Sequence, residues 1–207
     1  MDFLVWLSNF RNPVLDTFFS FITMFGEETF FIVIGLVFYW CISKKQGYYL
    51  LSVGLIGTIL NQFLKLLFRI PRPWVQDPNF TIVEAAREQA TGYSFPSGHT
   101  QTSVGIFGGI AVWNKNKIIR VISVALCILV PFSRLYLGVH TPLDVGVSTV
   151  LALIFIFVLY PLIKRAKNLL KTMRIVFALM TLFAAGFLIW VNLYKFPANV
   201  DISNLTH

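Results

Sequence analysis

Three polar clusters interrupt an otherwise apolar sequence, and their residue types suit the handling of a phosphate group. They are Lys65 with Arg72-Pro73, then Pro96-Ser97-Gly98-His99, then Ser133-Arg134 with His140 and Asp144. Arginine presents a planar fork that can bind two phosphate oxygens, and lysine supplies a compact charge. The chain has three histidines, and the two internal ones both lie in these clusters. The pattern predicts a site that binds a phosphate and cleaves its ester.

The third cluster has the most specific spacing. Thr141-Pro142 is typical of a helix start, which places Asp144 in the first turn, four residues after His140. An acidic residue there is often only a capping residue. With His140 and Arg134 beside it, we favour a catalytic role. The Asp144 carboxylate would accept a hydrogen bond from one imidazole nitrogen of His140 and leave the other nitrogen free to attack.

A phosphorus atom attacked by His140 needs a proton for its leaving oxygen, and His99 is the internal histidine that remains. We expect His140 to form a phosphohistidine while His99 donates a proton and later activates water. The phosphate would be held by Lys65, Arg72, Ser97, the Gly98 backbone and Arg134. We expect neither a metal nor another cofactor, because these cations take a metal's place and no convincing set of metal ligands is found.

Simpler interpretations exist for single residues. Pro96, Ser97 and Gly98 fit an ordinary capped helix start, although that does not account for His99. Arg69 lies at a helix end and can extend to lipid headgroups. Lys65 lies deeper, between Phe63-Leu64 and Leu66-Leu67, where a charge costs about 2.5–3.5 kcal/mol and usually marks function.

In order and spacing, the clusters match K-x6-R-P, P-S-G-H and S-R-x5-H-x3-D. The sequence therefore resembles the type 2 phosphatidic acid phosphatase superfamily of membrane lipid phosphatases, over roughly residues 28–163. The resemblance implies a core of six helices, a phosphohistidine at His140 and independence from metal.

Composition indicates one integral membrane unit. Of 207 residues, 57% are hydrophobic and 13% charged, which excludes an ordinary soluble domain. Apolar runs bounded by charges predict six spanning helices: 28–43, 47–69, 98–114, 117–138, 142–163 and 173–194. Around this all-α core of residues 27–195, we expect an amphipathic helix lying in the membrane interface within residues 1–26, and a polar tail, 196–207.

The basic residues predict the orientation. Ten of them fall in three loops on one side: Lys44 and Lys45, then Lys115, Lys117 and Arg120, then Lys164, Arg165, Lys167, Lys171 and Arg174. Positive loops face the cytoplasm, so both termini and the three clusters would face outward, with a bacterial plasma membrane as the expected location. The net charge of +8 comes mostly from these loops. We therefore expect membrane lipids rather than nucleic acid as partners.

An outward recess lined by cations suits a phosphate carried on a lipid. The first-choice substrate is undecaprenyl pyrophosphate, with phosphatidylglycerophosphate and phosphatidate as alternatives, and residues 74–95 are the expected lid and selector. A second hypothesis is a protein that binds or transports lipid phosphates without cleaving them. The presence of both motif histidines argues against it. A third hypothesis is a vanadate-dependent haloperoxidase, and the six predicted apolar spans argue against it.

Overall fold

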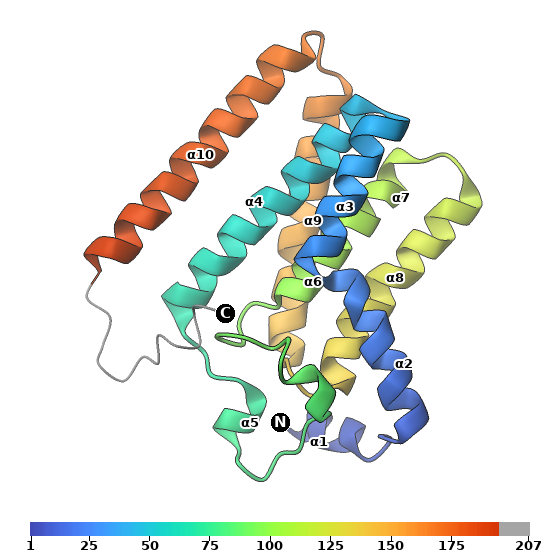
Figure 1. Ribbon diagram of the computed structural model, residues 1–207, viewed down its shortest axis with the longest axis vertical. Coiled ribbons are helices and arrows are strands. Elements are labelled where there is room, and N and C mark those ends of the chain that lie inside the picture. Colours follow the sequence, from blue (N-terminus) through green and yellow to red (C-terminus); the bar gives the residue numbers. More distant parts are fainter. Residues whose placement is uncertain (195–207) are drawn as a thin grey trace.

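The computed structural model describes residues 1–194, and within them the chain is helical without β-strands (Figure 1). The prediction of an all-α protein is confirmed. The helices are α1 (Asp2–Ser8), α2 (Pro13–Thr23), η1 (Met24–Gly26), α3 (Glu28–Val37), η2 (Phe38–Ile42), α4 (Lys44–Phe68), α5 (Pro73–Gln76), η3 (Glu84–Ala86), α6 (Gly98–Ser103), η4 (Val104–Gly108), α7 (Gly109–Trp113), α8 (Lys117–Tyr136), α9 (Pro142–Lys164) and α10 (Leu169–Leu193). Lys195 and the predicted tail lie outside the described residues.

A short polar capping residue stands at the start of several helices. Each accepts a hydrogen bond from a backbone N–H group of the first turn, which would otherwise lack a partner. These capping residues are Asn12 for α2, Ser43 for α4, Ser97 for α6, Asn116 for α8, Thr141 for α9 and Asn168 for α10. The sequence thus fixes where each chain segment enters the bundle.

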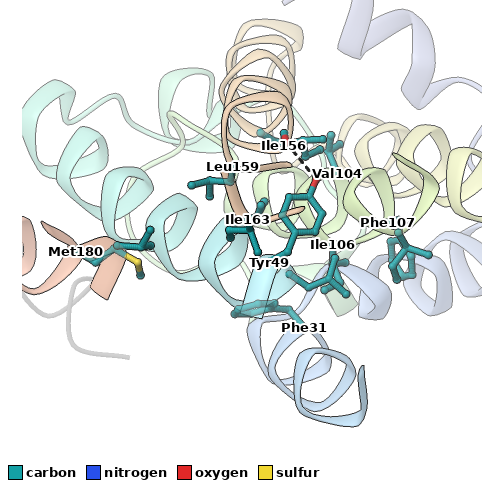
Figure 2. Close-up of a cluster of buried hydrophobic side chains, with 14 of the residues drawn as sticks. Phe31, Tyr49, Val104, Ile106, Phe107, Ile156, Leu159, Ile163 and Met180 are labelled. Atoms are coloured by element: carbon teal, nitrogen blue, oxygen red, sulfur yellow. Dashed lines mark hydrogen bonds between the residues drawn. The ribbon is translucent and has the colours of Figure 1, made fainter. Parts of the chain in front are cut away.

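The apolar core lies between α3, α4, α9 and the η4 turn (Figure 2). Tyr49 is fully buried there, and its hydroxyl group donates a hydrogen bond to the Ile156 carbonyl oxygen at 3.2 Å. The Phe31 ring packs directly on Gly54, where a Cβ atom would lie 2.0 Å from Cε2 of that ring. Glycine at this position allows α3 and α4 to approach closely.

Four helices in residues 1–194 are long and apolar enough to cross a membrane: α4 with the residues up to Gln76, α8, α9 and α10. A fifth is reached if Pro13–Gly26 and Glu28–Ile42, which bend by 54°, form one broken span. The expected span 98–114 is helical but short, since α6, η4 and α7 together cover only residues 98–113. The six predicted spans are therefore helical segments, and four of them have the length of a complete crossing.

The first two helices pack on the bundle. Phe19 of α2 contacts Phe132 and Tyr136 of α8, with ring centroids 5.4 Å and 4.5 Å apart. From α1, Leu4 packs with Phe80 and Ile82 of the segment before η3. One side of this N-terminal pair therefore has protein partners, while its predicted position in a membrane interface stays a prediction.

Chain direction gathers the three motifs at one end of the bundle. Helices α4 and α8 run toward this end, whereas α6 and α9 begin there (Figure 1). Residues 77–97 connect α5 to α6 over the same end, with η3 as their only helical turn. The motif residues thus come from helix ends that meet in space.

Candidate active site

A cavity of about 210 Å³ lies where these helix ends meet. Its lining residues are Gly26, Glu28, Gln62, Lys65, Arg72, Gln89, Thr91, Gly98, His99, Arg134 and His140. Six of the eight predicted site residues therefore line one cavity. Asp144 and Ser97 are buried beside it and do not belong to its lining.

His140 lies in the turn between α8 and α9, with Asp144 in the first turn of α9. The distance from His140 Nδ1 to Asp144 Oδ2 is 3.4 Å, and both side chains are almost completely buried. This separation is longer than an ordinary hydrogen bond, and Nδ1 has no hydrogen-bond partner within residues 1–194. Contacts of this kind often shorten only when substrate binds.

Asp144 is held by its own network. Its Oδ2 atom accepts hydrogen bonds from the Ser94 hydroxyl group at 2.6 Å and from the Thr141 backbone N–H group at 2.8 Å. The Thr141 hydroxyl oxygen accepts in return from the Asp144 N–H group, which completes a capping box. The capping and catalytic interpretations of Asp144 are therefore compatible, since one carboxylate begins α9 and faces His140.

Arg72 fixes the protonation pattern of His140. Its Nη1 atom lies 2.9 Å from His140 Nε2. A guanidinium group only donates hydrogen bonds, so Nε2 accepts and the imidazole proton is on Nδ1, facing Asp144. In this arrangement the one lone pair of Nε2 is directed at Arg72 Nη1, so this hydrogen bond must be given up before Nε2 can attack.

The other Arg72 contacts are with backbone carbonyl groups. Nε donates to Gly92 at 3.0 Å, Nη2 to Thr91 at 2.6 Å and Nη1 to Val139 at 3.0 Å. Most donors of this predicted phosphate-binding residue are thus already engaged. Arg72 joins the 77–97 segment to the turn that carries His140.

Arg134 is completely buried in the last turn of α8. Its Nη1 atom donates a hydrogen bond to the Thr23 hydroxyl group at 2.7 Å. The buried Nε and Nη2 atoms have no partner among the described residues. Because Arg134 also lines the cavity with Lys65, these donors are suited to phosphate oxygens.

His99 enters the cavity from the first turn of α6, and its buried Nε2 atom has no partner in the described part of the chain. Gly98 lines the cavity beside it. Ser97 has a different role, because its hydroxyl oxygen accepts from the Thr100 N–H group at 3.4 Å and caps α6. This bond uses Ser97 Oγ only as an acceptor, so the hydroxyl hydrogen is still available, and its contact with phosphate stays a prediction.

The electrostatic surroundings favour a neutral His140. Burial, followed by the positive charges of Arg72, Arg134 and Lys65, lowers the pKa of His140 well below its ordinary value. The neutral imidazole is the form that can attack phosphorus. The same cations that would attract a phosphate thus keep its attacker unprotonated.

Five residues of the cavity wall are not among the predicted site residues: Gly26, Glu28, Gln62, Gln89 and Thr91. Gln89 and Thr91 belong to residues 74–95, the segment expected to act as lid and selector. Gly26, Glu28 and Gln62 lie outside the motifs and outside that segment. In residues 1–194, no group of three or more His, Cys, Asp or Glu side chains is arranged to hold a metal ion.

Comparison with known proteins agrees with this geometry. A family model described as the PAP2 superfamily matches residues 45–168, which carry all three motifs. The chain belongs to the PAP2 superfamily. The resemblance inferred from the motifs is confirmed.

Relatives of this PAP2 protein include several phosphatases. It is 31% identical to undecaprenyl-diphosphatase BcrC of Bacillus subtilis, covering 72% of this chain and 76% of BcrC. It is 30% identical to a probable sphingosine-1-phosphate phosphatase of Dictyostelium discoideum, covering 72% of this chain but only 39% of that protein.

Two solved PAP2 structures share the fold. LpxE of Aquifex aeolicus has a TM-score of 0.66 at 26% identity, covering 76% of this chain and 92% of LpxE. A phosphatidylglycerolphosphate phosphatase of Bacillus subtilis has a TM-score of 0.63 at 26% identity, with 81% and 85% covered. The helical arrangement is therefore that of PAP2 membrane phosphatases.

Proposed function

We propose that this protein is a metal-independent lipid phosphate phosphatase that acts through a phosphohistidine at His140. The observation that carries the proposal is the orientation of His140 between Asp144 and Arg72, with Nε2 unprotonated beside a cavity lined by cations. This arrangement supplies a nucleophile, its orienting carboxylate and charge stabilisation at one place.

In the first step, His140 Nε2 gives up its hydrogen bond from Arg72 Nη1, and its lone pair forms a bond to phosphorus while the phosphorus–oxygen bond to the lipid breaks. The lipid oxygen keeps that electron pair and takes a proton from His99. In the second step, His99 accepts a proton from water, the water oxygen bonds to phosphorus, and the nitrogen–phosphorus bond returns its electrons to Nε2. Lys65, Arg72 and Arg134 stabilise the charge on the phosphoryl oxygens in both steps.

The proposed first-choice substrate is undecaprenyl pyrophosphate, for which the leaving group is the lipid monophosphate. The similarity to BcrC, over most of both chains, supports this choice. Phosphatidylglycerophosphate or phosphatidate is the alternative, and the structural similarity to the Bacillus subtilis phosphatase supports the first of these two. A panel of these three lipids and a sphingoid-base phosphate, assayed on purified protein, ranks them by kcat/KM.

The reaction is tested by trapping the intermediate. Purified full-length protein in detergent, with a chelator present, is mixed with a lipid phosphate carrying labelled phosphorus and quenched within one turnover. We expect an acid-labile label on the wild type and none on His140→Ala. Full turnover by His140→Ala contradicts the mechanism. Absence of turnover in the intact wild type favours a protein that only binds or transports lipid phosphates.

We further propose six membrane crossings, with the cavity and both termini outside a bacterial plasma membrane. The ten basic loop residues support this, because they lie at the helix ends opposite the cavity; Lys45 of the first loop donates to Ala166 of the third at 3.4 Å. Aromatic rings gather at the same basic end, where Lys164 lies over Trp113 and Tyr160.

A single cysteine tests the orientation. In a chain whose native Cys41 and Cys127 are replaced, Thr91→Cys places a thiol group at an exposed position of the cavity wall. We expect an impermeant thiol reagent to label it in intact cells. A control cysteine at Lys167, in the basic loop, should react only after permeabilisation. The reverse pattern inverts the proposed topology.

A further inference from the structure

The segment Thr23–Glu28 forms one wall of the catalytic cavity, although it precedes the residues matched by the PAP2 family model. Gly26 and Glu28 line the cavity, and the match begins only at residue 45. Thr23, at the end of α2, reaches the guanidinium group of Arg134. Part of the site is thus built by a region that carries none of the family motifs.

The contact between Thr23 and Arg134 is short and inaccessible to solvent. Oγ1 accepts from Arg134 Nη1 at 2.7 Å, and the two residues are 1% and 0% exposed. It is the one hydrogen bond that the Arg134 side chain makes within residues 1–194, since Nε and Nη2 lack partners there. The guanidinium group is planar and rigid. Fixing Nη1 therefore also fixes the direction of the donors that remain for a ligand.

Other contacts hold α2 in register with the last turns of α8. The Tyr136 hydroxyl group donates to Asp16 Oδ1 at 2.8 Å, and Arg11 Nε donates to the Tyr136 carbonyl oxygen at 3.0 Å. The Phe19 ring packs on the Tyr136 ring. Tyr136 is two residues from Arg134, so these contacts place the Thr23 hydroxyl group at a defined position beside the guanidinium group.

The same wall also sets the position of His99. A Cβ atom on Gly26 would lie 2.9 Å from His99 Cβ, from the His99 carbonyl oxygen and from Val130 Cγ1. Such distances are too short for carbon atoms, so η1 packs directly on the first turn of α6 and on α8. The wall therefore touches both a proposed phosphate ligand and the proposed proton donor.

We infer that Thr23 is a positioning residue for phosphate binding, acting through Arg134. This inference rests on the proposed phosphatase function. The Thr23 hydroxyl group takes one guanidinium donor and so directs Nε and Nη2 into the cavity, where they bind the phosphoryl oxygens. Glu28 adds a carboxylate to the mouth from the same segment, but the orientation of Arg134 depends on Thr23.

The test compares Thr23→Val with Thr23→Ser in the full-length protein. Valine keeps the shape of threonine but lacks the hydroxyl group, whereas serine keeps the acceptor. We expect Thr23→Val to lower kcat/KM for a lipid phosphate about 10–100-fold, as is typical when a residue that orients a ligand-binding group is lost. Orthovanadate and inorganic phosphate should inhibit it more weakly by a similar factor. Thr23→Ser should restore most of both losses.

Thr17→Val is the matched control. Thr17 is exposed on the same helix, and its hydroxyl group donates only to the Pro13 carbonyl oxygen, at 2.8 Å. It should behave as wild type. Unchanged kcat/KM and inhibition in Thr23→Val overturn the inference, as does a loss that Thr23→Ser does not reverse and that follows a lowered melting temperature. An inactive wild type would instead reject the phosphatase function itself.

Discussion

The floor and the mouth of the cavity are built in different ways. On the floor, Arg134 and His140 are buried and Asp144 lies behind them, each next to a defined partner. The residues at the mouth are exposed: Glu28, Gln62, Gln89 and Thr91. Within residues 1–194, their side chains make one hydrogen bond, which Gln89 donates to Glu27 at 3.2 Å. The floor can therefore bind and cleave any phosphoryl group, whereas the mouth contacts the part of the substrate to which that phosphoryl group is attached.

This difference separates chemistry from selectivity. Groups that are buried and held in place suit charge stabilisation in the transition state, because they need not reorganise during the reaction. Exposed side chains with few partners contribute less to each contact, because water competes with them. Substitutions on the floor should thus reduce activity on all substrates, whereas substitutions at the mouth should change the ratio between substrates.

The largest effect is expected for Asp144→Asn. The amide group would turn a donor toward His140 Nδ1, which must then accept, and the imidazole proton would move to Nε2. There it would oppose the Arg72 donor and remove the attacking lone pair. We expect kcat to fall about 10⁴-fold, the size seen when an orienting aspartate of a catalytic histidine becomes asparagine. The measurement is the rate of labelling in a single turnover.

The fold is the control for this variant. The atom that faces His140 Nδ1, Asp144 Oδ2, also accepts from Ser94 and Thr141. With an amide nitrogen in its place, the Ser94 hydroxyl group can rotate to accept, but the Thr141 N–H group loses its acceptor, so we expect a folded variant with a lower melting temperature in detergent than the wild type. A variant that is folded and retains more than a tenth of the wild-type rate would show that the 3.4 Å contact does not orient the nucleophile.

The next effect concerns His99, which lies on the floor but acts on the leaving group. We expect His99→Ala to slow hydrolysis of an alkyl phosphate about 10²–10³-fold, within the usual range for general acid catalysis. An aryl phosphate, whose leaving oxygen needs no proton, should lose much less in its first step. Equal losses on both substrates would assign His99 to binding rather than to proton transfer.

The pH dependence tests the charges around the floor. Because burial and the neighbouring cations lower the pKa of His140, the attacking neutral form persists as the pH falls through the usual histidine range. We expect single-turnover rates to stay constant through the usual histidine range and to decrease only below it, approaching tenfold per unit. A midpoint at or above the ordinary histidine value of about 6.5 would contradict this environment.

Sequence reasoning succeeded where geometry is local. The spacing of His140 and Asp144 around a helix start fixes their proximity, because four residues there span one helical turn. The motifs also predicted that helices distant in sequence meet at one end. Arg72 shows the limit. Its guanidinium group bonds to nearby backbone carbonyl groups, and the residue type alone does not reveal this competition.

The rest of the site depends on contacts between distant segments. Thr23 and Arg134 are separated by 111 positions, and Gly26 meets His99 only because α2 bends into α3. The N-terminal helices were expected to lie in the membrane interface, since their apolar residues recur at helical spacing. That spacing fits a membrane surface and the side of α8 equally well, so periodicity could not identify the packing partner.

The smallest and most selective effect is expected at the mouth. Within residues 1–194, Glu28 is the one carboxylate in the cavity lining, and a second phosphate at the mouth would be repelled by it. Glu28→Gln should raise the ratio of kcat/KM for a prenyl diphosphate over a lipid monophosphate by about fivefold, the scale of one exposed charge interaction. Gln62→Glu, which adds a carboxylate at the same rim, should lower it. If both variants change the two substrates equally, Glu28 contributes to the floor chemistry and the separation of chemistry from selectivity fails at this residue.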